Sequence, residues 1–127
     1  MRKMILILII LILIPICFAY VKPIDYHGVK VKFYDNTANK TKYFEMFDMI
    51  PNKYFEGLEY IKIFKPGIHI KYAGFYHVPA RGIDLYWWLD LDIMMHELCH
   101  HQNYIDGDTL SQISTHGGGF NECIERY

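Results

Sequence analysis

The sequence has no excess of charge of either sign. Its 13 Lys and Arg residues are balanced by 14 Asp and Glu residues, so the formal net charge is -1 at pH 7. Proteins that bind nucleic acid through its phosphates need a concentration of basic side chains. We therefore expect no nucleic acid among the partners of this protein.

The sequence also has no internal repeats, no low-complexity tract and no linker rich in Gly, Pro or Ser. In a chain of 127 residues, these absences argue against repeat and multidomain architectures. Hydrophobic residues make up 52% of the chain and aromatic residues 17%, which excludes an intrinsically disordered protein. The composition predicts one packed domain.

One long uncharged run, MILILIILILIPICF, follows two basic residues near the N-terminus. A basic flank, an apolar stretch and small residues in succession are typical of a secretory signal peptide. The apolar run at residues 4–21 is also just long enough to span a membrane, so it could contact the membrane as an uncleaved anchor. We predict that residues 1–19 are a signal peptide or an N-terminal membrane anchor. Residues 20–127 are then a domain that is secreted, or membrane-anchored outside the cytoplasm.

The predicted domain contains two cysteines, Cys99 and Cys123. An even pair in an exported domain favours a disulfide bond, because such bonds persist in oxidising compartments. Two buried free thiols are the alternative, since cysteine is often buried whatever its redox state.

The hydrophobic pattern predicts strands and helices in succession. Alternating apolar and polar residues predict strands at residues 29–34, 60–64, 68–72, 74–78 and 83–88. Helical spacing of apolar residues predicts helices at residues 41–50, 89–104 and 120–127. This order indicates an α+β fold.

The helix predicted at residues 89–104 contains the motif HELCH, an instance of HExxH. His96 and His100 are one turn apart on the same helix face, where both can bind one zinc ion at about 2.0 to 2.1 Å. Glu97 lies beside this face and can act on a water molecule rather than on the metal. His101 points away from it, so we expect it beside the site or in solvent. An ordinary helix with surface histidines is the alternative to a zinc site.

A catalytic zinc site needs a third protein ligand and one open position. Two later residues can supply that ligand: His116 in the run THGGGF, and Glu122 in the run NECIE. The longer pattern HExxHxxGxxH is absent, because Asn103 and Asp106 stand where it requires Gly and His. The residues alone leave His116 and Glu122 open.

HELCH followed by H-G-x-x-F is similar to the SprT-like, or Spartan-type, branch of the zincin metallopeptidases. The resemblance implies that His96, His100 and His116 bind Zn²⁺ and that Glu97 is the catalytic base. It also implies a zincin-like α+β fold with a small, mostly antiparallel sheet, a backing helix, an active-site helix carrying HExxH and a short C-terminal helix. A second resemblance is to the gluzincins, in which a glutamate on a later helix completes the zinc site, as Glu122 would here. We favour His116.

These features together predict a zinc-dependent metallopeptidase, and specifically an endopeptidase, that hydrolyses peptide or protein substrates outside the cytoplasm. The strand at residues 83–88 is expected at the sheet edge, where its main chain can pair with an extended peptide. Tyr104, His101 and Arg81 are candidates for stabilising the oxyanion. The alternative function is a catalytically silent zinc-binding or interaction module on the same fold.

Overall fold

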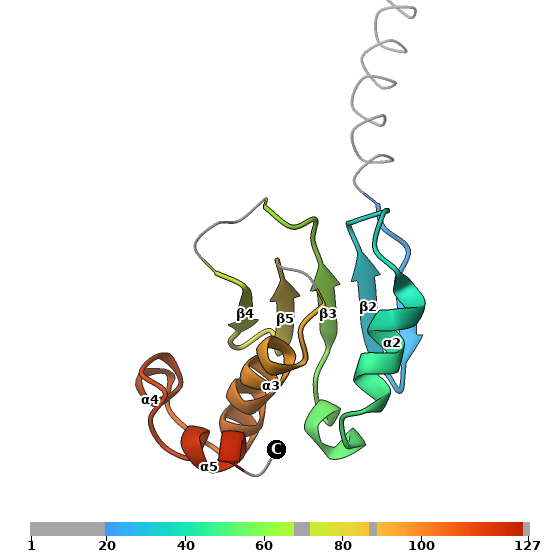
Figure 1. Ribbon diagram of the computed structural model, residues 1–127. Helices are drawn as coiled ribbons and strands as arrows, with labels where there is room; N and C mark the ends of the chain where they lie inside the picture. Colours follow the sequence, from blue (N-terminus) through green and yellow to red (C-terminus); the bar gives the residue numbers. More distant parts are fainter. Residues whose placement is uncertain (1–19, 68–71, 87–88, 126–127) are drawn as a thin grey trace, which may run out of the picture.

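The computed structural model describes residues 20–67, 72–86 and 89–125 (Figure 1). These residues form a small α+β fold with a five-stranded mixed sheet. Among them, no helix has the length and hydropathy needed to cross a membrane. The elements in chain order are β1 (Ile24–Tyr26), β2 (Val29–Phe33), α2 (Lys40–Asp48), the 3-10 helix η1 (Asn52–Phe55), β3 (Tyr60–Ile63), β4 (Gly74–His77), β5 (Gly82–Leu85), α3 (Leu91–Ile105), α4 (Leu110–Ser114) and α5 (Phe120–Glu125).

The prediction of a mostly antiparallel sheet is wrong. The strand order is β1-β2-β3-β5-β4, in which the two outer pairs are antiparallel and the two inner pairs, β2–β3 and β3–β5, are parallel. Between β2 and β3 the chain passes through α2 and η1, and a crossover of this length can bring the next strand in parallel. Apolar alternation indicates which side chains face the core, but it carries no information about strand direction.

The strand that we expected at the sheet edge is an inner strand. β5 lies between β3 and β4, so β4 is the edge strand of the described sheet on the side of α3. The strand predicted at residues 68–72 lies almost wholly outside the described residues. Three described elements, β1, η1 and α4, were not predicted.

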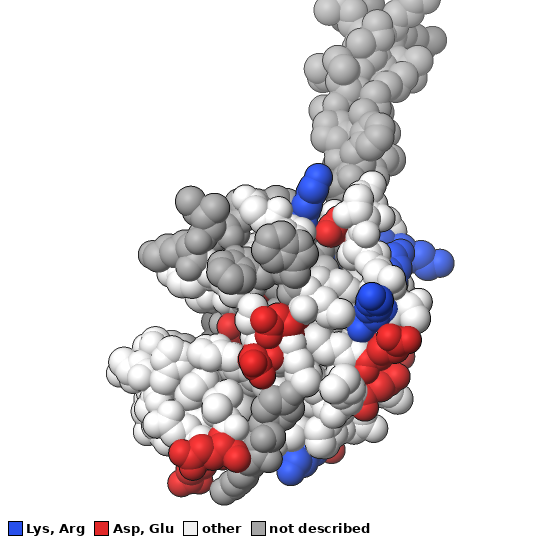
Figure 2. Space-filling view, in the orientation of Figure 1, with Lys and Arg blue, Asp and Glu red and all other residues white. Residues whose placement is uncertain are grey.

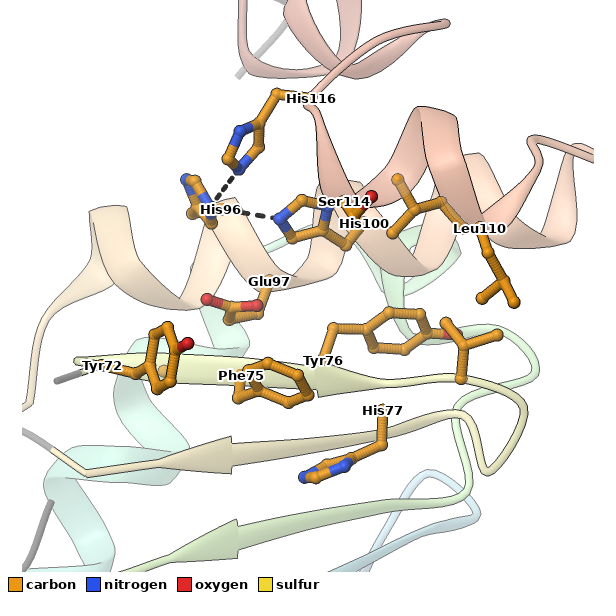
Figure 3. A pocket seen from close by; sticks show the side chains of 13 residues that line it. Tyr72, Phe75, Tyr76, His77, His96, Glu97, His100, Leu110, Ser114 and His116 are labelled. Carbon is orange, nitrogen blue, oxygen red and sulfur yellow. Dashed lines mark hydrogen bonds between the residues drawn. The ribbon is translucent and has the colours of Figure 1, made fainter.

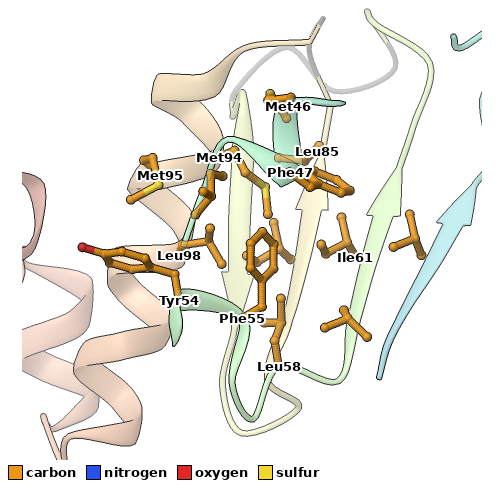
Figure 4. Packing of buried hydrophobic residues seen from close by; sticks show 14 of the residues in the cluster. Met46, Phe47, Tyr54, Phe55, Leu58, Ile61, Leu85, Met94, Met95 and Leu98 are labelled. Carbon is orange, nitrogen blue, oxygen red and sulfur yellow. The ribbon is translucent and has the colours of Figure 1, made fainter. Parts of the chain in front are cut away.

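α2 and α3 cover the same face of the sheet (Figure 1). Their buried side chains meet those of the central strands in one cluster (Figure 4), which includes Phe47 from α2, Met94 and Leu98 from α3, and Ile61 and Leu85 from the sheet. Full burial of each such side chain contributes about 1.5 to 3 kcal/mol to stability. This core also fixes the rotation of α3 about its axis.

α3 is held at its first turn and again near its middle. The Asp90 carboxylate accepts hydrogen bonds from the backbone N–H groups of Asp92 and Ile93, which caps the first turn. Later in the helix, Cys99 lies at disulfide distance from Cys123 of α5, with the two Cα atoms 5.7 Å apart. α5 is therefore tied to the helix that carries HExxH.

Candidate metal centre

Three histidine side chains converge at the surface of α3 (Figure 3). His96 and His100 project from successive turns of α3, and His116 reaches the same point from the segment between α4 and α5. The Nε2 atom of His96 lies 3.2 Å from Nε2 of His100 and 3.2 Å from Nε2 of His116. One ligand atom from each residue lies within 4.8 Å of the others.

These distances fit a tetrahedral zinc site. Nitrogen ligands about 2.0 to 2.1 Å from zinc lie about 3.3 to 3.4 Å from one another in a tetrahedron. The two Nε2 separations of 3.2 Å are close to that value. Three imidazoles leave one position open, which is the arrangement of catalytic rather than structural zinc sites.

The two histidines of α3 are held in the form that binds metal. Met94 and Leu98 face the sheet, so His96 and His100 emerge on the opposite side of the helix. Burial, together with the neighbouring imidazoles, lowers the pKa of His100 to about 4, and burial followed by the nearby His116 lowers the pKa of His96. Both rings are therefore neutral near pH 7, as metal ligation requires.

The position of His116 depends on a tight turn. His116 has φ +55° and Gly118 has φ +60°, so the backbone is in the left-handed region twice within three residues. The Asp108 carboxylate lies inside this turn, where it accepts a hydrogen bond from the Gly119 N–H at 3.4 Å. A Cβ atom on Gly118 would overlap that carboxylate. The glycine run therefore allows the turn that carries His116 to close around Asp108.

Phe120 packs against all three histidine rings. The centroid of its ring lies 4.9 Å from that of His96, 4.7 Å from that of His100 and 4.6 Å from that of His116. Phe120 is also the first residue of α5, whose Cys123 contacts α3. This packing gives a physical reason for the spacing H-G-x-x-F, because the phenylalanine supports the ring of the histidine four residues earlier.

Glu97 lies between α3 and the edge strand β4. Its side chain is buried, and an added Cβ atom on Gly74 would lie only 3.0 Å from its Cγ and 3.1 Å from its Oε1. The backbone N–H of Tyr76 donates a hydrogen bond to the carboxylate. Burial raises the pKa of Glu97 to about 7, although this hydrogen bond acts in the opposite direction. A carboxyl group with such a pKa can both accept and donate a proton near neutral pH.

His101 is fully buried and connects three elements, contrary to the solvent position that we had considered. Its Nε2–H donates to the backbone carbonyl of Glu56 at 2.7 Å, because a carbonyl can only accept. Its Nδ1 then accepts from the hydroxyl of Tyr76 at 2.9 Å. Tyr76 thus contacts α3 twice, through its side chain to His101 and through its backbone to Glu97. No sequence signal distinguished this role.

The structure separates the two candidates for the third ligand. His116 joins the cluster, whereas Glu122 lies exposed on α5 and is not part of it. Among the described residues, none of the three oxyanion candidates lines the cleft beside the histidines. One of them, Arg81, donates to the Glu59 carboxylate at 2.6 Å.

The histidines and Glu97 open into a cleft of about 510 Å³ between β4 and α4. Gly74, Tyr76 and Val78 line it on the side of β4. On the face in Figure 2, Lys and Arg side chains are scattered rather than gathered into a basic patch. The three histidines and Glu97 are thus accessible from one common cleft.

Comparison with known proteins finds no relative: no protein-family model, curated protein or solved structure matches this chain. The resemblance to SprT-like peptidases therefore depends on the motif residues 96–120 and on the order of strands and helices that leads to them. The geometry of the three histidines and Glu97 carries the functional argument.

Proposed function

We propose that this protein is a zinc-dependent peptidase that cleaves extended peptide segments. The observation that supports this most directly is the convergence of His96, His100 and His116 at zinc-ligand spacing, with Glu97 facing the same cleft. Glu97 is not one of the three residues whose ligand atoms converge, so its carboxylate is free to act on a water molecule rather than on the metal. A hydrolase needs such a group as its general base.

The residues of the chain have separate roles in this proposal. When bound, zinc supplies Lewis-acid chemistry, which polarises a substrate carbonyl and lowers the pKa of a water molecule. Glu97 accepts the proton of the attacking water at its carboxylate and later donates that proton to the leaving amine. The hydrogen bond from the Tyr76 N–H keeps the carboxylate oriented between these two steps.

β4 is the element best placed to hold a substrate. It is the edge strand of the described sheet, and its residues line the cleft beside Glu97. A peptide that adds to this edge gains main-chain hydrogen bonds whatever its sequence. Such pairing favours an endopeptidase, because the substrate can extend beyond the cleft at both ends.

The compartment follows from the sequence, as part of the same proposal. The apolar run within residues 4–21 would export the domain or anchor it outside the cytoplasm. Cys99 and Cys123 lie at disulfide distance, which is compatible with an oxidising compartment.

Two measurements on purified full-length protein test the proposal. Elemental mass spectrometry should find about one zinc per chain, as a single three-histidine site requires, and His116→Ala should lower the zinc content. The matched control is Glu122→Gln, which removes the rival ligand and should leave zinc bound. Absence of zinc from the native protein, even after zinc is supplied, would contradict the metal centre.

The second measurement separates catalysis from metal binding. Glu97→Gln should retain zinc and lose hydrolysis of a quenched fluorescent peptide mixture, whereas Glu122→Gln should keep both. Full activity in Glu97→Gln would rule out Glu97 as the base. Zinc binding without hydrolysis in the wild-type protein would instead indicate the catalytically silent module.

A further inference from the structure

Two aliphatic side chains and one serine line the cleft on the side of α4. Leu110, at the start of α4, is 66% exposed. In Figure 3 it points from α4 toward β4, at the opposite end of the cleft from Tyr72. Ile113, one turn later, and Val78, after β4, also line the cleft. Leu110 and Ile113 form the surface that we call the α4 wall, and Val78 lines the cleft from the side of β4.

The cleft offers almost no charge to a substrate side chain. Its described lining contains no Lys, Arg or Asp, and its single carboxylate is that of Glu97. α4 has the sequence LSQIS, and the region of α4 is free of charged side chains on the face in Figure 2. A charged substrate side chain placed there would find no oppositely charged partner on α4, whereas an apolar side chain could pack on Leu110.

The position of the α4 wall relative to β4 determines which substrate side chain it meets. In a strand added to the edge of β4, successive side chains would point to opposite faces of the sheet. One set points toward the face covered by α3, where Glu97 and the histidines lie, and α4 closes that side of the cleft. A side chain of this set, next to the bond under attack, would contact Leu110.

From these observations we infer that the site selects peptides with a bulky apolar side chain at one position beside the cleaved bond, and that Leu110 determines this selection. The inference rests on the proposed peptidase function. The capping box of α4, in which Thr109 and Gln112 bond each other's backbone, holds Leu110 in place before a substrate arrives. The substrates are thus extended segments with exposed apolar residues, as in unfolded protein, rather than charged peptides.

A peptide library tests this inference on full-length, zinc-loaded protein. Cleavage products are identified by mass spectrometry, and the residue frequencies at each position around the cleaved bond are compared between variants. Leu110→Glu should shift the preference at one position away from Leu, Phe, Ile and Met and toward Lys and Arg, by on the order of 10-fold. Leu110→Ala should weaken the apolar preference without creating a new one. The matched control is Met49→Glu, which places the same charge at a 68% exposed apolar residue at the end of α2.

The outcomes distinguish the inference from the function on which it rests. An unchanged cleavage profile in Leu110→Glu, or a wild-type preference for charged side chains at every position, would overturn the role of Leu110 while leaving the peptidase intact. If zinc-loaded wild-type protein cleaves no peptide in the library, the peptidase proposal fails and the inference fails with it. A switch that is confined to one position, and absent from Met49→Glu, supports both.

Discussion

Gly74 offers a way to move the carboxylate of Glu97, the proposed base, without contacting the three histidines. A Cβ atom at this position would lie 3.0 Å from Glu97 Cγ, 3.1 Å from Glu97 Oε1 and 3.2 Å from Ile93 Cγ2. Carbon atoms in favourable contact are about 3.5 to 4.0 Å apart. Gly74→Ala therefore requires Glu97, or β4 itself, to move by about 0.5 Å.

The expected effect is on catalysis rather than on stability. A misplacement of about 1 Å at an active site can lower the rate about 100-fold, so half that displacement corresponds to a loss of about 10-fold in kcat/KM. The free energy of unfolding should change by less than about 1 kcal/mol, because alanine restricts the unfolded chain more than glycine does and thereby offsets the contact. Zinc affinity should not change, since no histidine is among the nearest atoms.

Three assays check this prediction: peptide hydrolysis, zinc affinity by chelator competition, and unfolding in urea. A double-mutant cycle with Glu97→Asp supplies the control. The shorter aspartate side chain places its carboxylate farther from position 74, so the added methyl group should displace it less. The effects of Gly74→Ala and Glu97→Asp should then be less than additive. Fully additive effects, or a parallel loss of zinc affinity, would refute the view that Gly74 acts through Glu97.

Three other predictions concern the support of the metal centre. Reduction of the Cys99–Cys123 pair, which closes a loop of 24 residues, should lower the free energy of unfolding by about 3.5 kcal/mol in the loop-entropy treatment, as measured in urea with and without reductant. An equal stability in both conditions would show that the thiols are free. Gly118→Ala should weaken zinc binding in chelator competition, more than Gly107→Ala does, because both glycines have positive φ but only Gly118 has a carboxylate in the way. Since burial and the neighbouring imidazoles lower the pKa of His100 from 6.5 to about 4, this residue should destabilise the metal-free protein as pH falls below about 6.5, where the unfolded chain takes up the proton that the folded chain rejects. Glu97, whose pKa burial raises to about 7, acts in the opposite direction over the same pH range. In the variant Glu97→Gln, which removes this opposing contribution, urea unfolding midpoints that do not fall between pH 7.5 and pH 5 would contradict the burial of His100.

The part of the site that lies within one helix could be predicted from the sequence. The relation between His96 and His100 depends only on the helical period, and the predicted helix at residues 89–104 agrees closely with α3 at Leu91–Ile105. Apolar residues at helical spacing and the capping aspartate are local signals. No tertiary contact is needed to read them.

The environment of Glu97 could not be predicted in the same way. It depends on β4 being the edge strand and on Gly74 facing α3. Both follow from the spatial order of the strands in the sheet. The four residues of β5 are all buried, which fits an inner strand, but their sequence GIDL contains an aspartate and has no continuous apolar run. We therefore predicted the strand at residues 83–88, which is β5, as the edge strand, whereas the edge strand is β4.

The apolar pattern of α5, together with the Cys99–Cys123 pair, distinguishes the two candidate ligands His116 and Glu122. Phe120 and Cys123 are three residues apart and share one face of α5, and that face is turned toward α3 by the cysteine pair and by the packing of Phe120 on the histidines. At 3.6 residues per turn, Glu122 lies well away from the centre of that face, which agrees with its exposed position. A helix that buries Phe120 and Cys123 against α3 does not direct Glu122 at the three histidines, so the C-terminal apolar pattern favours His116 as the third ligand of the proposed site once the cysteines are paired.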